Sequence, residues 1–334
     1  MKKIISMIMI LTLGGMLLAG CSQEAPKVEE NIVDEIVLEE MTINVAGPSG
    51  APTLSMIKMF KENPSFGDHI NMNYESVKSP DSMAARIISG EIDIAVVPTN
   101  LAASLYNRDV EYTLVGSSVW GILYMVGNEE ISSFEDLKGK EIHTIGRGLT
   151  PDIVLRYVLS NNGIDPENDI TLTYMGEGAE LASGFISGNS HIAVIPEPAL
   201  SNVMLKKPDT VMLFDLQQEW SKLTEEDSYP QASLIIKNEL IENHPEFVEQ
   251  FIKEYEESIN WLNQNPELAG EYSEELETGL SKPAVINGLE RSNIKFVRAK
   301  DAKSAIEKYL TVLHDYQKET VGGKLPDEGF YYQK

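Results

Sequence analysis

Short apolar runs alternate along the chain with segments whose apolar residues recur at helical spacing. Residues 94–97 and 192–195 are wholly apolar, which is typical of strands buried on both faces. Leu54, Ile57 and Phe60 fall on one face of a helix that is expected to pack on a sheet. Strands that alternate with helices in this way predict an α/β fold with mainly parallel sheets.

The same order of elements occurs twice, at a separation of roughly a hundred residues. Residues 88–98 read Ile-Ser-Gly-Glu-Ile-Asp-Ile-Ala-Val-Val-Pro, and residues 186–196 read Ile-Ser-Gly-Asn-Ser-His-Ile-Ala-Val-Ile-Pro. Further strand-like runs recur at the same separation, at 43–47 and 142–146 and at 70–75 and 170–175. In the second copy, Thr150 is expected to cap a helix whose first residue is Pro151. Such a repeat predicts two similar α/β lobes with a cleft between them.

We expect the chain to cross twice between these lobes. Strand-like residues around Trp120 should carry it out of the first lobe, and strand-like residues 229–236 should bring it back. The remaining residues have helical periodicity and are expected to complete the first lobe. The predicted lobes are residues 41–122 together with 236–334, and residues 123–235.

The first forty residues predict where the protein is located in the cell. Lys2 and Lys3 precede an apolar run that ends in Leu-Ala-Gly-Cys, and Cys21 is the only cysteine of the chain. This pattern is typical of a signal peptide over 1–20 and resembles the lipobox of bacterial lipoproteins, whose cysteine becomes acylated. An uncleaved anchor is the alternative. The acidic segment 21–40 is expected to be a tether, which predicts lipid anchoring on the extracytoplasmic face of the cell membrane.

Charge and composition exclude several classes of function. A net charge of −25 argues against a nucleic-acid partner, because phosphate-binding surfaces need clustered Lys and Arg. A single cysteine provides no disulfide framework, and the five histidines have no metal-ligand spacing. Nucleophile-elbow and phosphate-loop motifs are missing from the sequence. We therefore predict no catalytic residues, no metal and no cofactor.

Four turns are candidates for ligand binding, because ligands of open α/β sheets bind beyond the carboxyl ends of the strands. Glycine lets the backbone approach a ligand, and the first N–H groups of the following helix are free donors. Such turns hold carboxylate, sulfonate, nitrate or carbonyl oxygens without a basic side chain. The turns lie at residues 47–52, 98–100, 146–151 and 196–198.

Three side chains, one in these turns and two at the first crossing, add chemistry. Glu197 could accept a hydrogen bond from a ligand amine or ring N–H, or it could be an acid that interacts with a helix dipole. In the first case Glu197→Ala weakens ligand binding and leaves the stability of the ligand-free protein unchanged. Trp120 and Tyr124 could stack on a planar ligand, or they could pack the hinge.

The chain resembles the type II solute-binding proteins of ABC importers, in the branch that binds nitrate, sulfonates, taurine and thiamine precursors. The resemblance runs from about residue 41 to about residue 313. It rests on Ser-Phe-Glu-Asp-Leu-Lys-Gly-Lys at 133–140, Ser-Gly-Glu-Ile-Asp-Ile-Ala at 89–95 and Asn-His-Pro-Glu-Phe-Val at 243–248.

This resemblance implies two α/β lobes joined by two hinge strands and closing on a ligand. The ligand-contacting turns of the family correspond to Ser49, Gly50, Ala51, Thr99, Asn100, Gly148, Leu149, Thr150 and Glu197. Binders of simple anions often add a cationic side chain, and these turns offer only Arg147. Because Glu197 would also repel an anion, the sequence favours a zwitterionic or heterocyclic solute over a sulfonate-like one.

The predicted function is therefore a lipid-anchored solute-binding protein of an ABC importer. Its expected partners are a small-molecule ligand, an ABC permease with its ATPase, and the membrane through the lipid anchor. We expect a monomer. Two alternatives stay open: a lyase or synthase of a biosynthetic pathway with the same two-lobed fold, and a receptor component for a membrane sensor.

Overall fold

The computed structural model describes residues 40–77 and 80–334. The predicted signal peptide over 1–20, the lipidation site Cys21 and the tether up to residue 39 lie outside the described residues. None of the helices in the described part combines the length and the apolar composition that a membrane crossing requires.

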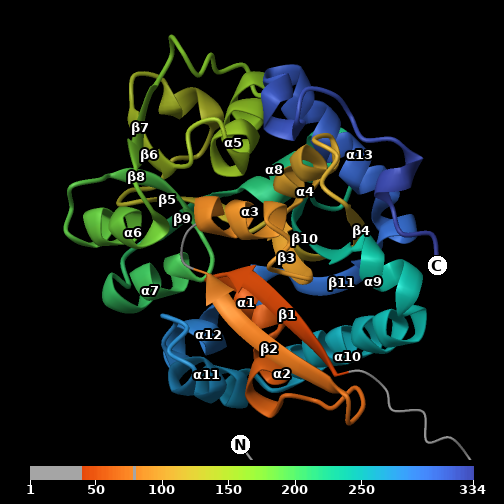
Figure 1. Cartoon of the computed structure of the whole chain (residues 1–334). Helices are drawn as coiled ribbons and strands as arrows, with labels where there is room; N and C mark the ends of the chain where they lie inside the picture. The colour runs from red at the N-terminus through yellow and green to blue at the C-terminus, as the bar shows by residue number, and fades with distance from the viewer. Residues whose placement is uncertain (1–39, 78–79) are drawn as a thin grey trace, which may run out of the picture. The chain divides into compact units, whose positions relative to one another are not determined.

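The described residues form two sheets, and the first has six strands in the order β11-β4-β10-β3-β1-β2 (Figure 1). Its strands are β1 (Met41–Pro48), β2 (Ile70–Val77), β3 (Ile94–Pro98), β4 (Tyr112–Trp120), β10 (Pro230–Lys237) and β11 (Ile294–Arg298). β1 is parallel to β2 and β3, whereas β10 is antiparallel to its neighbours β3 and β4, and β11 is antiparallel to β4. Strands β1 to β4 therefore run in one direction, and β10 and β11 run in the other.

The second sheet has five strands in the order β7-β6-β8-β5-β9. Its strands are β5 (Leu123–Gly127), β6 (Glu141–Ile145), β7 (Thr171–Met175), β8 (Ile192–Pro196) and β9 (Val211–Asp215). β6 is parallel to β7 and β8, and β5 is antiparallel to β8 and β9. Only β5, the strand through which the chain enters this sheet, runs against the others.

Helices connect most of the strands. The first lobe begins with α1 (Ala51–Ser55), α2 (Ile57–Glu62), α3 (Pro80–Ile88) and α4 (Thr99–Tyr106). The second sheet is accompanied by η1 (Phe134–Leu137), α5 (Thr150–Asn161), α6 (Gly178–Ile186), α7 (Ala199–Lys206) and α8 (Leu216–Thr224). After β10 come α9 (Asn238–Asn243), α10 (Pro245–Gln264), α11 (Pro266–Glu275), α12 (Lys282–Gly288), η2 (Glu290–Ser292), α13 (Ala299–Tyr316), η3 (Lys318–Val321) and η4 (Glu328–Phe330).

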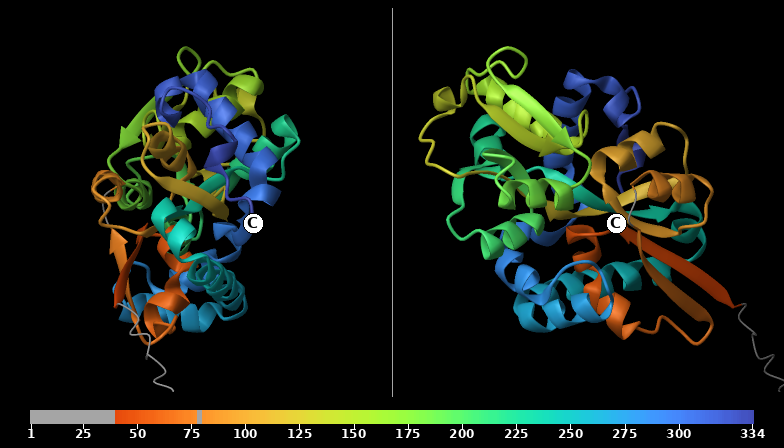
Figure 2. Two further views of the ribbon diagram at one scale, coloured as in Figure 1. Left: turned by 45° about the vertical axis from the view of Figure 1, so that its right-hand side comes forward. Right: turned by 90° about the vertical axis from the view of Figure 1, so that its left-hand side faces the viewer.

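We call the six-stranded sheet with α1–α4 and α9–α13 the first lobe, and the five-stranded sheet with α5–α8 the second lobe. Both belong to one compact unit. Figures 1 and 2 show α10, α11 and α12 near α1 and α2, and α13 beside α5. One apolar core lies between the first sheet and α1, α2 and α10, and another lies between β5, β8, α6 and α7. A third core runs from the first sheet through α13 to α5 and α8, so α13 joins the two lobes.

The α/β architecture with two sheets confirms the fold class predicted from the sequence. The repeated runs form β1, β2 and β3 in one copy and β6, β7 and β8 in the other, as their apolar patterns predict. The return crossing differs. Residues 230–235, which the sequence pattern assigns to the second lobe, belong to β10 and pair with β3 and β4 of the first sheet. Hydrogen bonds to β3 and β4 on its two sides pair the backbone N–H and C=O groups of β10. β10 is therefore part of the first sheet from Pro230 onward, and the chain crosses back before Pro230.

Candidate functional site

The carboxyl ends of the parallel strands lead into the turns that the sequence singles out. β1 and β3 end at two of them in the first lobe, and β6 and β8 end at the other two in the second lobe. Gly50 has a φ of 104°, a conformation that favours glycine, and open space lies where its side chain would stand. The turn after β1 therefore has room beside its backbone.

Polar side chains of the first-lobe turns are bonded within that lobe. The Ser49 hydroxyl oxygen lies 3.1 Å from that of Ser76, which is near the end of the neighbouring strand β2. The Asn100 side-chain amide donates to the main-chain oxygen of Thr320 at 3.3 Å. Asn100 is therefore tied to the segment after α13, and its amide nitrogen already has a partner.

Thr99 and Ala51 are buried at the beginnings of their helices. The Thr99 hydroxyl oxygen lies 2.8 Å from that of Ser233, which lies 3.0 Å from that of Ser117. These three hydroxyl groups join the beginning of α4 to the neighbouring strands β10 and β4. Thr99 and Ala51 therefore shape the end of the sheet, and neither side chain offers an unpaired polar group.

The loop between β6 and α5 is arranged in a similar way. The Gly148 N–H donates to the carboxylate of Asp152 at 2.8 Å, and the Leu149 side chain is 52% exposed. The Thr150 hydroxyl oxygen lies 2.6 Å from that of Tyr309 on α13. The predicted cap at Thr150 is wrong: α5 begins at Thr150 and Leu149 is the N-cap, because the Thr150 hydroxyl pairs with Tyr309 and makes no capping bond.

Asp152 organises this loop, a role that the sequence pattern does not reveal. Its fully buried carboxylate accepts hydrogen bonds from Arg156 Nε and from the Tyr174 hydroxyl, both at 2.6 Å, besides the one from Gly148. The guanidinium of Arg147 lies over the Tyr174 ring, 4.4 Å from its centroid. The only acid in the first turn of α5 was a visible signal, but its three partners come together only in the fold.

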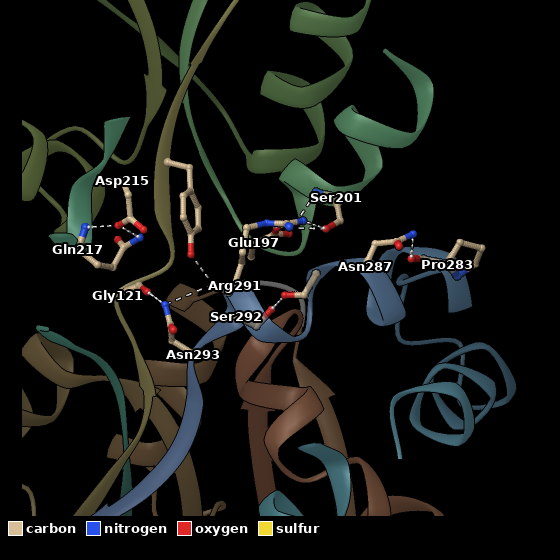
Figure 3. Close-up of polar contacts among 12 residues, drawn as sticks. Gly121, Glu197, Ser201, Asp215, Gln217, Pro283, Asn287, Arg291, Ser292 and Asn293 are labelled. Carbon is tan, nitrogen blue, oxygen red and sulfur yellow. Dashed lines mark hydrogen bonds and ion pairs between the residues drawn. The ribbon is translucent and has the colours of Figure 1, made fainter. Parts of the chain in front are cut away.

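Glu197 lies at the end of β8 in an ion pair that crosses between the lobes (Figure 3). Arg291, which precedes β11 of the first lobe, donates from Nε to Glu197 Oε1 at 2.6 Å. Arg291 Nη2 also donates to the hydroxyl of Ser201, 2.8 Å away on α7. Ser201 donates to Glu197 from its hydroxyl and from its main-chain N–H, both at 3.1 Å. The carboxylate is thus surrounded by donors of the protein itself.

Burial raises the pKa of Glu197 above its ordinary value. The positive charge of Arg291 and the hydrogen bonds from Arg291 and Ser201 act in the opposite direction and reduce the shift. The Glu197 side chain has no exposed area, whereas the Arg291 side chain is 30% exposed. The loss of hydration is therefore concentrated on the carboxylate, which is why burial is the main cause of the raised pKa of Glu197.

A cavity of about 700 Å³ adjoins this ion pair. Its wall is formed mainly by polar, charged and aromatic side chains from both lobes, together with Leu289 and Ile294. They include Trp120, Tyr124, Asp215, Gln217, Arg291 and Lys295.

Trp120 and Tyr124 are fixed in the wall of this cavity by hydrogen bonds at their polar ends. Trp120 Nε1 donates to the main-chain oxygen of Lys295 at 3.0 Å, and the Lys295 ammonium lies 5.2 Å from the centre of the Trp120 ring system. The Tyr124 hydroxyl donates to the main-chain oxygen of Arg291 at 2.9 Å. The two aromatic residues chosen from the sequence therefore line one cavity.

The structure separates the predicted site residues into two groups. Trp120 and Tyr124 line the cavity, and Glu197 contacts its wall through Arg291. The turns at 49–51, 99–100 and 148–150 do not contribute to its lining. Arg291 is the main residue that the sequence did not single out, because nothing in its local pattern distinguishes it from a surface arginine. Within residues 40–77 and 80–334, no group of three or more His, Cys, Asp or Glu side chains could hold a metal ion.

Comparison with protein families gives one match that covers most of the chain. The family model described as "NMT1/THI5 like" matches residues 69–269. Among individual proteins, 80 residues are 34% identical to YtlA of Bacillus subtilis, whose name describes a binding protein. That alignment covers 23% of this chain and 24% of YtlA, so it spans about a quarter of that relative's length.

Solved structures of similar fold cover most of the chain. The structure of an ABC transporter from Parabacteroides distasonis is 27% identical, has a TM-score of 0.75 and covers 88% of this chain and 99% of that one. The aliphatic sulphonate binding protein SsuA of Escherichia coli is 16% identical, with a TM-score of 0.68 and coverage of 87% and 92%. The nitrate-binding protein NrtA of Synechocystis is 12% identical, with a TM-score of 0.60 and coverage of 85% and 84%. Together with the family match, these likenesses confirm the resemblance drawn from the sequence.

Proposed function

Because the chain belongs to the NMT1/THI5-like family, we propose that it is a solute-binding protein of an ABC importer that captures a small molecule between its two lobes. One observation carries the proposal: the walls of the cavity of about 700 Å³ come from both lobes. Trp120, Arg291 and Lys295 belong to the first lobe, and Tyr124 and Gln217 belong to the second. A volume in this range is typical of pockets that hold small molecules.

A cavity with this wall links solute binding to closure. A solute that contacts both lobes binds the closed arrangement more tightly than the open one, and it shifts the population toward closure by that difference. Such a protein needs no catalytic groups. The function therefore requires only complementarity to the solute and a surface that a permease recognises.

The cavity offers mixed chemistry to a solute. Trp120 and Tyr124 provide aromatic surface, Arg291 and Lys295 provide positive charge, and Asp227 and Glu290 provide negative charge. The carboxylate of Asp215 is occupied, because it accepts hydrogen bonds from the first residues of α8. These features support a small polar solute with a planar part, within the zwitterionic, heterocyclic or sulfonate-like range that we propose.

Further parts of the proposal concern location and partners. We propose that Cys21 carries the lipid anchor, that the binding domain faces the outside of the cell membrane, and that a monomer delivers its solute to an ABC permease with its ATPase. We also propose that the lobes divide near residues 122–123 and in the segment before Pro230. Cys21→Ser should release the protein from membranes or leave an uncleaved precursor, and a variant that stays bound and processed would refute the anchor.

Native mass spectrometry of the full-length protein, purified without unfolding, tests the binding function directly. We expect a retained small molecule, or a shift of the melting temperature by one compound of a panel of amino acids, sulfonates and heterocycles. Isothermal titration with that compound should give saturable binding and no turnover. Catalytic conversion of the compound by the purified chain would favour the enzyme alternative, and failure of the whole panel would refute the proposal.

Variants separate the cavity from the turns. If the solute lies in the cavity, Trp120→Phe and Lys295→Ala should weaken binding, whereas Ser49→Ala and the exposed control Lys300→Ala should not. If the solute lies at the turns, Ser49→Ala should weaken binding and the two cavity variants should not. The second result would contradict our placement of the site while leaving solute binding intact.

A further inference from the structure

The contact between Glu197 and Arg291 joins segments that belong to different lobes. Glu197 follows β8 and Ser201 lies in the first turns of α7, both in the second lobe, while Arg291 lies between α12 and β11 in the first lobe. The three side chains form a closed set of hydrogen bonds between 2.6 and 3.1 Å. We call Glu197, Ser201 and Arg291 the clasp.

The backbone of α12 approaches the clasp very closely. A Cβ atom added to Gly288 would lie 2.6 Å from the hydroxyl oxygen of Ser201 and 2.9 Å from Glu197 Oε2. Carbon–oxygen contacts this short are not tolerated without displacement, so glycine is what allows α12 and α7 to meet here. This close packing does not depend on charge. The lobes are therefore complementary here both in shape, through Gly288, and in charge, through Arg291 and Glu197.

Two further hydrogen bonds reinforce the contact on the first-lobe side. The main-chain oxygen of Arg291 accepts from the hydroxyl of Tyr124 on β5. Asn293 donates from its side chain to the main-chain oxygen of Gly121 at the first crossing, 2.6 Å away. The segment that carries Arg291 is thus anchored to the crossing and to the first strand of the second sheet.

The energetics of the clasp depend on whether the lobes are together. A carboxylate without exposed area is very unfavourable unless a cation and hydrogen-bond donors surround it. When the lobes separate, Glu197 loses Arg291 and gains water, and Arg291 gains water as well. The complete set of bonds therefore exists only in the closed arrangement, where the hydrogen bonds and the charge of Arg291 offset part of the cost of burying the carboxylate.

We infer that the clasp holds part of the solute-free population closed and positions the guanidinium of Arg291 at the cavity wall. Glu197 is then a positioning residue that acts through Arg291, and the solute is not its direct partner. The inference rests on the proposed function in one respect, namely that the two lobes open and close. It implies that solute binding needs to supply less free energy for closure than it would in a protein without the clasp.

Single-molecule energy transfer on the solute-free protein tests the clasp. Because Cys21 is the only cysteine, the full chain with Cys21→Ser accepts a dye pair at two engineered cysteines, Asn189→Cys on the second lobe and Glu256→Cys on the first. Both positions are exposed; Asn189 precedes β8 whereas Glu197 follows it, and Glu256 lies in the middle of α10. We expect a substantial short-distance population before any solute is added.

Two variants, one that changes charge and one that changes shape, should both reduce the short-distance population. Arg291→Gln removes the cation, and Gly288→Ala inserts a methyl group into the close contact. Each should raise the ratio of open to closed molecules on the order of tenfold, because each prevents the full set of bonds. Arg291→Lys should restore part of the closed population, since it keeps the charge but cannot bond to Glu197 and Ser201 together.

The chain offers a matched control for each variant. Arg86 is 24% exposed and pairs with two carboxylates inside the first lobe, so Arg86→Gln removes a similar cation without affecting the contact between lobes. Gly184 lies in α6 with nothing within 4 Å of an added Cβ, so Gly184→Ala is a helix substitution without a clash. Neither control should change the distance distribution.

The outcomes separate the clasp from the function. Distance distributions of Arg291→Gln and Gly288→Ala that match the wild type, or that shift no more than the two controls, would overturn the clasp. If Arg291→Gln does not fold, Gly288→Ala decides the question alone. If the wild type binds solute and both variants remain closed, the clasp is refuted and the proposed function is not. A protein that binds no compound but opens in both variants refutes the proposed function and supports the clasp.

Discussion

Glu197→Ala should destabilise the solute-free protein, in contrast to what the sequence alone suggests. The substitution removes the acceptor of three hydrogen bonds, one from Arg291 and two from Ser201. The main-chain N–H of the fully buried Ser201 then has no partner, which costs about 1–3 kcal/mol. Arg291 also loses its carboxylate, but its partial exposure lets water replace some of the interaction.

The expected loss is therefore about 2 kcal/mol, because relief from burying a carboxylate offsets part of it. Urea unfolding of the full-length protein, stripped of solute by unfolding and refolding, measures the free energy from the midpoint and slope. Glu197→Gln is the matched comparison, since it keeps the shape and the acceptor oxygen and removes the charge. It should lose much less stability. A loss below about 0.5 kcal/mol for Glu197→Ala would refute the internal role of this carboxylate.

The dependence on pH gives a second readout of the same group. Because burial raises the pKa of Glu197 in the folded protein, the folded state binds this proton more tightly than the unfolded chain. The contribution of Glu197 to stability is then greatest below its ordinary pKa of about 4.5 and falls as pH rises through the folded pKa. Relative to Glu197→Gln, the wild type should lose stability across that window. An increase over the same window would mean that Arg291 outweighs burial.

Three further tests address separate parts of the structure. Solute binding should change the fluorescence of Trp120, so Trp120→Phe should remove most of the signal. Trp261 lies in α10 and stacks on Tyr272 of α11, so Trp261→Phe should leave the signal unchanged. Asp152→Asn should cost about 2 kcal/mol at neutral pH and accelerate hydrogen exchange of the Gly148 amide, measured by NMR or mass spectrometry. Gly116→Ala should cost about 1–3 kcal/mol in urea unfolding, because its Cβ would lie 2.6 Å from an aromatic ring and from a main-chain oxygen of β11.

The elements that could be predicted from the sequence are those with a local periodic signal. The apolar runs at 94–97 and 192–195 form β3 and β8 because a strand buried on both faces needs an unbroken apolar run. The internal repeat predicted the matching order of strands and helices in the two lobes. The return strand was misassigned at its first residues, because its apolar pattern is the same whichever sheet it joins.

The candidate site was less predictable because its contacts connect distant parts of the chain. Arg291 and Glu197 are 94 residues apart, and neither has a local pattern that identifies the other. The hydroxyl of Thr150 was predicted to cap a helix, but it forms a hydrogen bond with the hydroxyl of Tyr309, 159 residues away. Trp120 could be selected because its planar ring lies at the predicted crossing, whereas nothing in the sequence around Lys295 distinguishes that residue. Side-chain pairs of this kind are determined by topology and packing, which periodicity does not encode.

The position of β10 has a consequence for how the molecule assembles. β10 lies between β3 and β4, yet the chain completes every strand of the second sheet before it reaches β10. The second sheet comes from one uninterrupted stretch and can form from nearby segments, whereas the first sheet requires a long loop to close. Until Pro230–Lys237 is inserted, β3 and β4 each have an unpaired edge. We therefore expect the second sheet to acquire protection first during refolding, and the first sheet to be the part that aggregates when β10 is delayed.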